Sequence, residues 1–178
     1  MFEEFDIKSA LELGSYEGQS AVFMIEHGVE HLDCVDLWSD NSMKISGLDP
    51  NTCRGVETRF DHNITLAADG NDSCFIRKHK MSTETFLKQA SSTYDLIYID
   101  ASHLAKDILK DATMSFDLLR PGGLMVFDDY DWNIDERTRP AMAIKSWADV
   151  MEPYVKEWEM CHVRQKYYIK SELSHVHT

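Results

Sequence analysis

The stretch that decides the fold is LELGSYEGQS, residues 11–20, where a short apolar run meets two glycines and then a helical pattern. Gly14 and Gly18 stand directly after a predicted first strand, Ala10–Leu13, and before a predicted helix, Gln19–His27. Open α/β sheets bind their ligands at such turns, at the carboxyl ends of parallel strands. The free backbone N–H groups at the start of the helix favour an anionic ligand group.

Short apolar segments alternate with longer helical patterns along most of the chain. Runs rich in Ile, Val, Leu and aromatic residues are typical of buried parallel strands. They predict further strands at Cys34–Leu37, Cys74–His79, Asp95–Asp100 and Leu124–Asp128. Helices are predicted between them at Gly55–Ala68, Thr83–Ala90 and Leu104–Leu119. This alternation predicts an open α/β sheet with right-handed crossover connections.

The second half of the chain carries signals that end the alternation. RPGG, residues 120–123, is expected to stop the preceding helix and turn the chain into the next strand. A helix is predicted over Pro140–Tyr154, and residues 157–170 then predict two strands with a turn near Arg164 and Gln165. Two strands without a helix between them pair antiparallel or are separated in the sheet.

Length, composition and charge are those of a soluble globular protein. The chain has 178 residues, 43% hydrophobic and 28% charged, and we expect one domain over residues 1–170 with a flexible tail over 171–178. It has no apolar run of membrane-spanning length, and its four cysteines form no CxxC pair, so a reducing cytoplasm is the expected location. The net charge of −13 opposes nucleic-acid binding, so a small-molecule or sugar partner is expected rather than DNA, RNA or a membrane.

The glycine turn narrows the choice of ligand. A dinucleotide site requires GxGxxG, whose middle glycine lets the backbone approach the pyrophosphate, and Tyr16 occupies that position here. The GK[ST] signature of a phosphate-binding P-loop is absent as well. Asp36 ends the predicted second strand, where an acid accepts hydrogen bonds from both hydroxyls of a ribose. A ligand with a carboxylate and a nucleoside, but without phosphates, therefore stays open.

Together these motifs resemble those of the class I S-adenosylmethionine-dependent methyltransferases. ELGSYEGQS (12–20) is similar to the family's ExGxxxGxS loop, and DCVDLW (33–38) to its second motif. YDLIYIDASH (94–103) and LLRPGGLMVFDDYDW (118–132) resemble its later strands. The set is most similar to the metal-dependent small-molecule O-methyltransferases of the catechol and macrolide-sugar types. The resemblance implies a Rossmann-like seven-stranded sheet, mostly parallel with an antiparallel last strand, and helices on both faces.

The resemblance also implies which residues bind S-adenosylmethionine. The glycine turn would shape the methionine end of the site, Asp36 would hold the ribose, and Leu37 or Trp38 would pack near the adenine. Ser82 and Thr83 follow the third predicted strand, where the family contacts the adenine ring, although MSTETFL (81–87) lacks the usual leading glycine. The expected cofactor-binding residues are Glu12, Gly14, Ser15, Tyr16, Gly18, Ser20, Asp36, Leu37, Trp38, Ser82, Thr83 and Asp100.

Three acids stand where two predicted strands end. Asp100 ends one strand, and Asp128 and Asp129 follow the next, so the three would meet at one sheet edge. Clustered carboxylates have raised pKa values unless a cation neutralises them, and oxygen ligands of this type suit Mg²⁺. In the metal-dependent relatives the metal ligands fall on these three positions, and Asp131 lies outside the set. The alternative is a solvated loop in which Asp128 caps a turn.

His103 follows Asp100 by three residues. An unperturbed imidazole has a pKa of about 6.5, which suits a general base, and Asp107 one helical turn later is expected to orient the ring. In the family this position carries the base, a lysine in the catechol type and a histidine in the sugar type. His103 and Asp100 are therefore the expected catalytic residues, and the alternative for His103 is a surface position at a helix start.

The activity expected from these features is metal-dependent O-methylation of a hydroxyl on a small molecule or a sugar. A non-catalytic or partner-dependent S-adenosylmethionine-binding module stays open, because only nine residues precede the first predicted strand, where the relatives carry covering helices. The irregular stretch at residues 39–54, or a second subunit of a homo-oligomer, would then supply the cover. A metal-independent methyltransferase also stays open.

Overall fold

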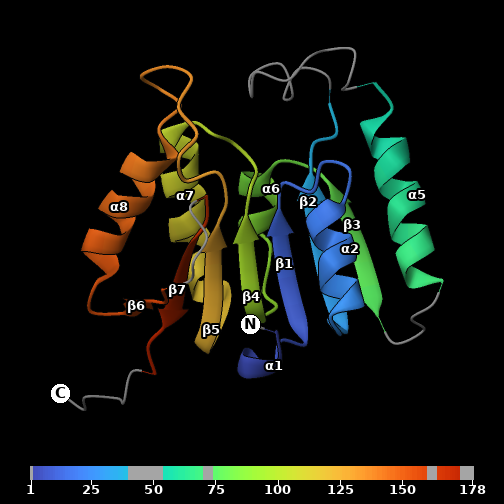
Figure 1. The fold of residues 1–178 in the computed structure, drawn as a ribbon, viewed down its shortest axis with the longest axis horizontal. Coiled ribbons are helices and arrows are strands. Elements are labelled where there is room, and N and C mark those ends of the chain that lie inside the picture. Colours follow the sequence, from blue (N-terminus) through green and yellow to red (C-terminus); the bar gives the residue numbers. More distant parts are fainter. Residues whose placement is uncertain (1, 40–53, 70–73, 160–163, 173–178) are drawn as a thin grey trace.

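The computed structural model describes residues 2–39, 54–69, 74–159 and 164–172 (Figure 1). The predicted loop at residues 39–54 and the predicted tail at 171–178 lie almost entirely outside these residues. The elements are α1 (Phe2–Phe5), β1 (Ser9–Leu13), α2 (Gln19–Glu26), β2 (His31–Asp36), α5 (Val56–Ala68), β3 (Phe75–Lys80), α6 (Thr83–Leu87), β4 (Tyr94–Ile99), α7 (Ala105–Ser115), the 3₁₀ helix η1 (Phe116–Leu118), β5 (Leu119–Phe127), α8 (Pro140–Met151), β6 (Val155–Glu157) and β7 (Lys166–Lys170).

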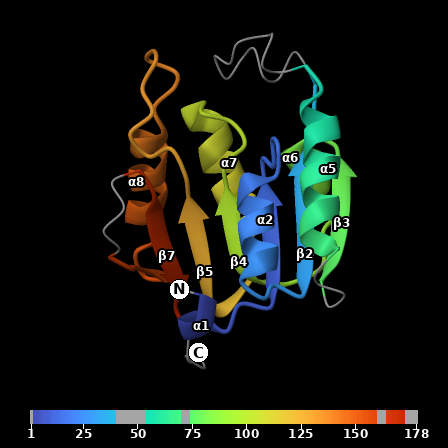
Figure 2. The same cartoon turned by 45° about the vertical axis from the view of Figure 1, so that its right-hand side comes forward.

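The strands form one seven-stranded sheet in the order β3-β2-β1-β4-β5-β7-β6. Strands β1 to β5 run parallel, whereas β7 is antiparallel to β5 and β6 is antiparallel to β7. Figures 1 and 2 show the parallel strands pointing to one edge of the sheet, where the loops of the candidate site lie. The predicted fold class, a mostly parallel seven-stranded sheet that ends in an antiparallel strand, is confirmed.

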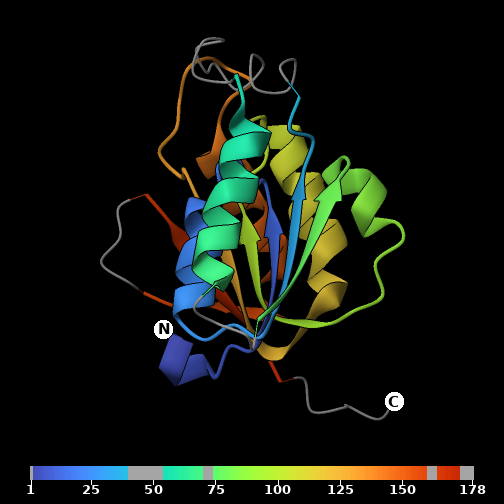
Figure 3. The same ribbon diagram turned by 90° about the vertical axis from the view of Figure 1, so that its right-hand side faces the viewer.

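Helices cover both faces of the sheet, and the strand residues alternate between them. Leu11, Met125 and Phe127 belong to the apolar cluster under α6, α7 and α8. Ala10 and Val126 belong to the cluster under α1, α2 and α5 on the opposite face. Figure 3 shows the two layers edge-on, with α2 and α5 on one side and α6 and α7 on the other.

The prediction for RPGG was wrong. Helix α7 already ends at Ser115, and residues 120–123 lie inside β5. Tyr94 pairs with Leu119 and Leu96 pairs with Leu124, so the four residues form an irregularity between two stretches of regular pairing. Proline, which has no N–H to donate, is tolerated at such an interruption of the ladder. The stop signal therefore marks a break within a strand and does not separate a helix from a strand.

At the C-terminal end the antiparallel pairing of two strands is confirmed, but the boundaries shift. Helix α8 ends at Met151 and β6 begins at Val155, earlier than predicted. The connection from β6 to β7 includes residues 160–163, which lie outside the described residues, so only its Arg164 and Gln165 end can be compared with the predicted turn. In the described part of the chain, every helix is too short or too polar to cross a membrane.

Candidate active site

The glycine turn after β1 packs directly against the chain that leaves β4. Gly14 has φ +91°, and a Cβ atom there would lie 2.5 Å from the carbonyl carbon of Asp100. The Asp100 N–H donates to the Leu13 carbonyl at 2.8 Å, which joins the ends of the two strands. Gly18 has φ +83° and lies against the Phe60 ring. Both glycines are therefore required by conformation and by close packing.

Asp36 at the end of β2 holds this turn in place. Its Oδ2 accepts hydrogen bonds from the backbone N–H groups of Ser15 (3.1 Å) and Tyr16 (2.9 Å). Its Oδ1 accepts from the Trp38 N–H at 2.7 Å, and the Trp38 indole donates to the Tyr16 carbonyl at 2.8 Å. Tyr16 (φ +46°) and Trp38 (φ +42°) both adopt the left-handed conformation that side chains rarely accept. Such strained residues cluster at functional sites.

Glu12 and Ser20 support the turn from beneath. Glu12 is completely buried, its Oε1 accepts a hydrogen bond from the Ser20 hydroxyl, and its Oε2 has no partner among the described residues. Burial raises the pKa of the Glu12 carboxyl above its ordinary value. These two residues, together with Ser15, Gly18 and Trp38, do not line the cavity described next. Their predicted part in cofactor binding stays a prediction, and the structure places them as supports.

A cavity of about 550 Å³ lies at the carboxyl ends of the parallel strands. This volume is within the range of small-molecule sites. Of the predicted site residues, those that line it are Gly14, Tyr16, Asp36, Leu37, Ser82, Thr83, Asp100, His103 and Asp129. Leu37 lines the cavity, whereas Trp38 is buried against Phe60, so of the two residues predicted for the adenine region only Leu37 faces the cavity.

The cavity wall also contains polar residues of α7 that the sequence did not single out. Lys106, Lys110 and Asp111 face the cavity from this helix. Asp111 is 2% exposed and accepts a hydrogen bond from the Thr83 hydroxyl at 2.8 Å, and burial raises its pKa to about 6. Asp107 and Asp111 are four residues apart and share a helix face. This spacing is the only feature of the sequence that indicates a place for Asp111 beside Asp107 in the cavity wall.

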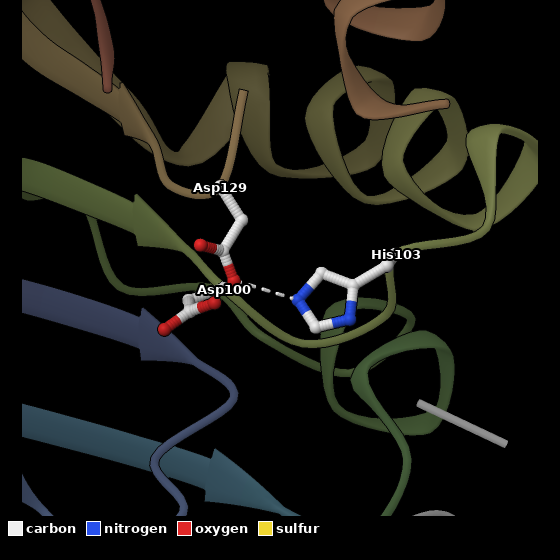
Figure 4. A group of neighbouring side chains, drawn as sticks. All are labelled: Asp100, His103 and Asp129. Atoms are coloured by element: carbon white, nitrogen blue, oxygen red, sulfur yellow. Dashed lines mark hydrogen bonds and ion pairs between the residues drawn. The ribbon is translucent and has the colours of Figure 1, made fainter. Parts of the chain in front are cut away.

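Three side chains converge at the end of β4 and β5. Asp100, His103 and Asp129 each present a ligand atom within 4.8 Å of the others (Figure 4). His103 Nε2 lies 2.9 Å from Asp129 Oδ2, and its ring stacks on Trp132 with centroids 4.6 Å apart. Asp129 has φ +51°, a further strained position at this edge. Asp100 and Asp129 thus meet as predicted, and His103 joins them directly.

The prediction that Asp107 orients the His103 ring was wrong. Asp107 accepts a hydrogen bond from the Ser102 hydroxyl at 3.0 Å. His103 precedes α7, which begins at Ala105, so it does not share a helix face with Asp107. The ring is held by Asp129 on one nitrogen and by the Trp132 face.

Asp128 faces a separate set of donors. Its Oδ2 accepts from the Tyr98 hydroxyl and from Gln165 Nε2 (3.1 Å), and its Oδ1 accepts from the Asp129 N–H at 2.6 Å. The Tyr167 hydroxyl in turn donates to Gln165. The carboxylate of Asp128 is therefore engaged by other protein groups and is not part of the group formed by Asp100, His103 and Asp129, although it lies near enough to raise the pKa of Asp100. Its place in the predicted metal ligand set stays a prediction.

Charge in this region is unevenly compensated. Burial, and then the neighbouring Asp128 and Asp129 carboxylates, raise the pKa of Asp100 well above its ordinary value. His103, and to a smaller extent Arg164 at 2.6 Å, lower the pKa of Asp129. A buried carboxylate next to other carboxylates is a position that a cation would stabilise. Two carboxylates and an imidazole are also donors that bind divalent metals.

Residues 11–130 match the family model described as a methyltransferase domain. The chain belongs to this methyltransferase-domain family. The match extends from β1 to just beyond β5 and so includes both the glycine turn and the acidic group of the methyltransferase domain.

Individual relatives of the methyltransferase domain are distant. The uncharacterized protein R132 of Acanthamoeba polyphaga mimivirus is 23% identical over 145 residues, which are 79% of this chain and 60% of that protein. The chain thus spans less than two thirds of the length of this relative. Two O-methyltransferases are among the solved structures that share the fold. The O-methyltransferase TomG from Streptomyces achromogenes, solved with SAM, is 13% identical with a TM-score of 0.69, over 96% of this chain and 76% of that one. The O-methyltransferase from Bacillus cereus, solved with SAH, is 16% identical with a TM-score of 0.64, over 95% and 77%.

Proposed function

We propose that this chain is an S-adenosylmethionine-dependent O-methyltransferase that acts on a hydroxyl group of a small molecule or a sugar, with a divalent metal at the acidic end of its cavity. One observation supports this above the others. The glycine turn with Asp36 and the group formed by Asp100, His103 and Asp129 line the same cavity. A methyl donor and an acceptor can therefore be held side by side, which is the main requirement of a group transfer.

The cofactor would occupy the part of the cavity between the glycine turn and α6. Gly14 leaves room for the methionine end, and Asp36, which lines the cavity, would accept hydrogen bonds from the ribose in addition to those from the three backbone N–H groups. Leu37, Ser82 and Thr83 line the wall that the adenine would contact. The positive end of the α2 dipole, next to the turn, would favour the carboxylate of the methionine group.

The carboxylates at the other end fit a divalent metal, because Asp100 is partly buried beside Asp129 and His103, among acids that raise its pKa. Asp100 and Asp129 would hold the metal with Asp128, which adjoins Asp129. A bound Mg²⁺ would supply Lewis-acid polarisation of the acceptor hydroxyl. TomG and the Bacillus cereus protein support the activity class through their shared fold.

His103 would take the acceptor proton. Its Nε2 faces the two carboxylates and lies 2.9 Å from Asp129 Oδ2 (Figure 4), so a hydroxyl beside them would come within its reach. To accept the hydroxyl proton, Nε2 would have to release Asp129 Oδ2 and carry no proton of its own, with the ring proton on Nδ1. S-adenosylmethionine would supply the methyl group and leave as S-adenosylhomocysteine. The acceptor oxygen would gain the new bond to carbon, and the electron pair of the broken carbon–sulfur bond would stay on sulfur. Stacking on Trp132 keeps the ring oriented during this transfer.

The test is methyl transfer measured by mass spectrometry with a panel of catechols, vicinal diols and sugars. Wild-type chain with Mg²⁺ is expected to convert S-adenosylmethionine to S-adenosylhomocysteine and to methylate at least one acceptor. His103→Gln is expected to lose about 100-fold in turnover while keeping cofactor affinity. His62→Gln, an exposed histidine of α5, serves as the matched control.

The alternatives give different results in the same test. Cofactor binding without turnover on any acceptor would favour a non-catalytic or partner-dependent binding module. Turnover that survives thorough chelation and the Asp128→Asn change would favour a metal-independent methyltransferase. The expected cytoplasmic location and assembly into a homo-oligomer stay predictions.

A further inference from the structure

At the candidate metal site, Asp129 is already paired with a cationic side chain of the protein itself, that of Arg164. Arg164 Nη2 lies 2.6 Å from Asp129 Oδ1, while His103 Nε2 lies 2.9 Å from the other oxygen, Oδ2. Both oxygens of this carboxylate are therefore already engaged by protein groups. A guanidinium is always protonated, so its charge stands beside any divalent cation that binds Asp129. The two positive charges would repel each other at this distance.

The Arg164 side chain can move away from Asp129, whereas the Arg164 backbone is held by a hydrogen bond. The side chain is 63% exposed, and ion pairs with one exposed partner are weak and easily exchanged. The Arg164 carbonyl accepts a hydrogen bond from the Tyr130 N–H at 2.8 Å, which fastens it to the loop that carries Asp129. The guanidinium can thus move away from Asp129 without moving the strand or the loop.

A second acid stands next to the guanidinium. Asp131 Oδ1 lies 3.7 Å from Arg164 Nε, and its side chain is 54% exposed. Asp131 is the one acid of the DDYDW run that the proposed metal ligands leave without a role. It is close enough to receive the guanidinium after a small side-chain rotation, and far enough to be the weaker partner while Asp129 is available.

We infer that Arg164 is a tethered cation that occupies Asp129 when no divalent metal is bound and transfers to Asp131 when one binds. The inference rests on the metal site of the proposed function. It assigns Arg164 as a residue that sets metal affinity through competition, and Asp131 as the alternative partner that lowers the cost of the exchange. Asp129 would then have a cationic partner in both states.

The test is a double-mutant cycle read by Mn²⁺ affinity, with Mn²⁺ alone titrated into the full chain and free Mn²⁺ measured by electron paramagnetic resonance. Arg164→Gln is expected to tighten Mn²⁺ binding by about fivefold, because it removes the competitor. Asp131→Asn is expected to weaken binding by about twofold to threefold, because Arg164 loses its alternative partner. In the Arg164→Gln background, Asp131→Asn is expected to have almost no effect.

A simple effect of net charge predicts a different pattern. If the two side chains acted only at long range, Asp131→Asn would weaken binding by the same factor in both backgrounds, and that result would overturn the inference. Unchanged or weaker binding in Arg164→Gln would overturn it as well. Lys166→Gln is the matched control, because Lys166 is two residues away and pairs with Glu157 at 2.5 Å. Its loss is expected to leave affinity within about twofold of wild type.

The outcomes also separate this inference from the proposed function. If all variants bind Mn²⁺ and the effects of the two substitutions on affinity are additive, the exchange of Arg164 is overturned and the proposed metal site stands. Absence of Mn²⁺ binding in wild type and in Arg164→Gln removes the metal from the proposed function and the exchange with it. Binding that is detectable only in Arg164→Gln would be the strongest support for competition.

Discussion

A Cβ atom added at Gly14 would lie 2.5 Å from the carbonyl carbon of Asp100, so the glycine turn and the strand-end acid are in backbone contact. The two residues come from neighbouring strands, β1 and β4, whose ends are joined by the Asp100 N–H to Leu13 carbonyl bond. The glycine turn and the acidic end of the cavity are therefore one packed unit. A change at the turn should therefore disturb the packing around Asp100.

Gly14→Ala is expected to lower the free energy of unfolding by about 3 kcal/mol and to abolish cofactor binding, because it adds a steric clash to an unfavourable φ. Gly28→Ala is the matched control. Gly28 also has a positive φ of +89°, but a Cβ atom there meets nothing within 4 Å. Its cost should be about 1 kcal/mol from conformation alone. Urea unfolding of both variants measures the difference, and equal losses would show that the contact with Asp100 does not matter.

Asp36→Ala is expected to weaken S-adenosylmethionine binding by at least about tenfold, because three backbone N–H groups of the turn region lose their acceptor. Asp95→Ala is the control. Asp95 accepts from the Lys8 and Ser9 N–H groups at 2.8 Å each, but at the opposite ends of the strands. Isothermal titration should show lost affinity only in the first variant. Comparable loss in both would mean that the effect comes from general destabilisation.

Asp111→Asn is expected to change how stability depends on pH. Burial raises the folded-state pKa of Asp111 to about 6, above its ordinary value of 3.8, so the native state binds more protons than the unfolded state between about pH 4 and 6. As the pH rises through this window, the free energy of unfolding of the wild type should therefore fall by about 3 kcal/mol in total, relative to that of the variant. Asparagine keeps an acceptor for the Thr83 hydroxyl.

Chemical unfolding at pH 4, 5, 6 and 7.5 measures this difference. The stability of Asp111→Asn should equal that of wild type near pH 4 and exceed it at pH 7.5. Asp149→Asn, an exposed acid of α8, should follow wild type at every pH. A difference between wild type and Asp111→Asn that stayed constant over the whole range would contradict the raised pKa.

Asp100→Asn is expected to have opposite effects with and without divalent metal. Burial and the neighbouring carboxylates raise the pKa of Asp100, so its charged form destabilises the metal-free protein near pH 7.5, and removal of the charge should raise the melting temperature. Mg²⁺ at about 100 times its dissociation constant should stabilise wild type by about 2.7 kcal/mol and the variant by much less. Chelation should reverse the gain in wild type. Equal Mg²⁺ stabilisation of Asp100→Asn would exclude Asp100 as a ligand.

Features that depend on neighbours along the chain were predictable from the sequence. The strand, glycine turn and helix at residues 11–20 follow from local composition and period, and they appear as β1, the turn and α2. Strand-end acids are predictable too, because the carboxyl ends of parallel strands must share an edge. Asp100 and Asp129 meet for that reason. RPGG misled because proline and glycine break a strand and end a helix with the same local chemistry.

Only the tertiary structure decided which groups those acids face. Asp128 is turned toward Tyr98 and Gln165, and Asp129 toward Arg164, partners that lie 30 to 37 residues away in the chain. Asp111 lies in the cavity wall because α7 packs beside α6. The periodicity of the sequence does not predict this packing. The sequence by itself determined that acids would gather at one edge of the sheet beside a glycine turn. Their orientation, and hence which of them a cation can reach, depends on side chains brought together by folding, and such long-range contacts leave no local pattern.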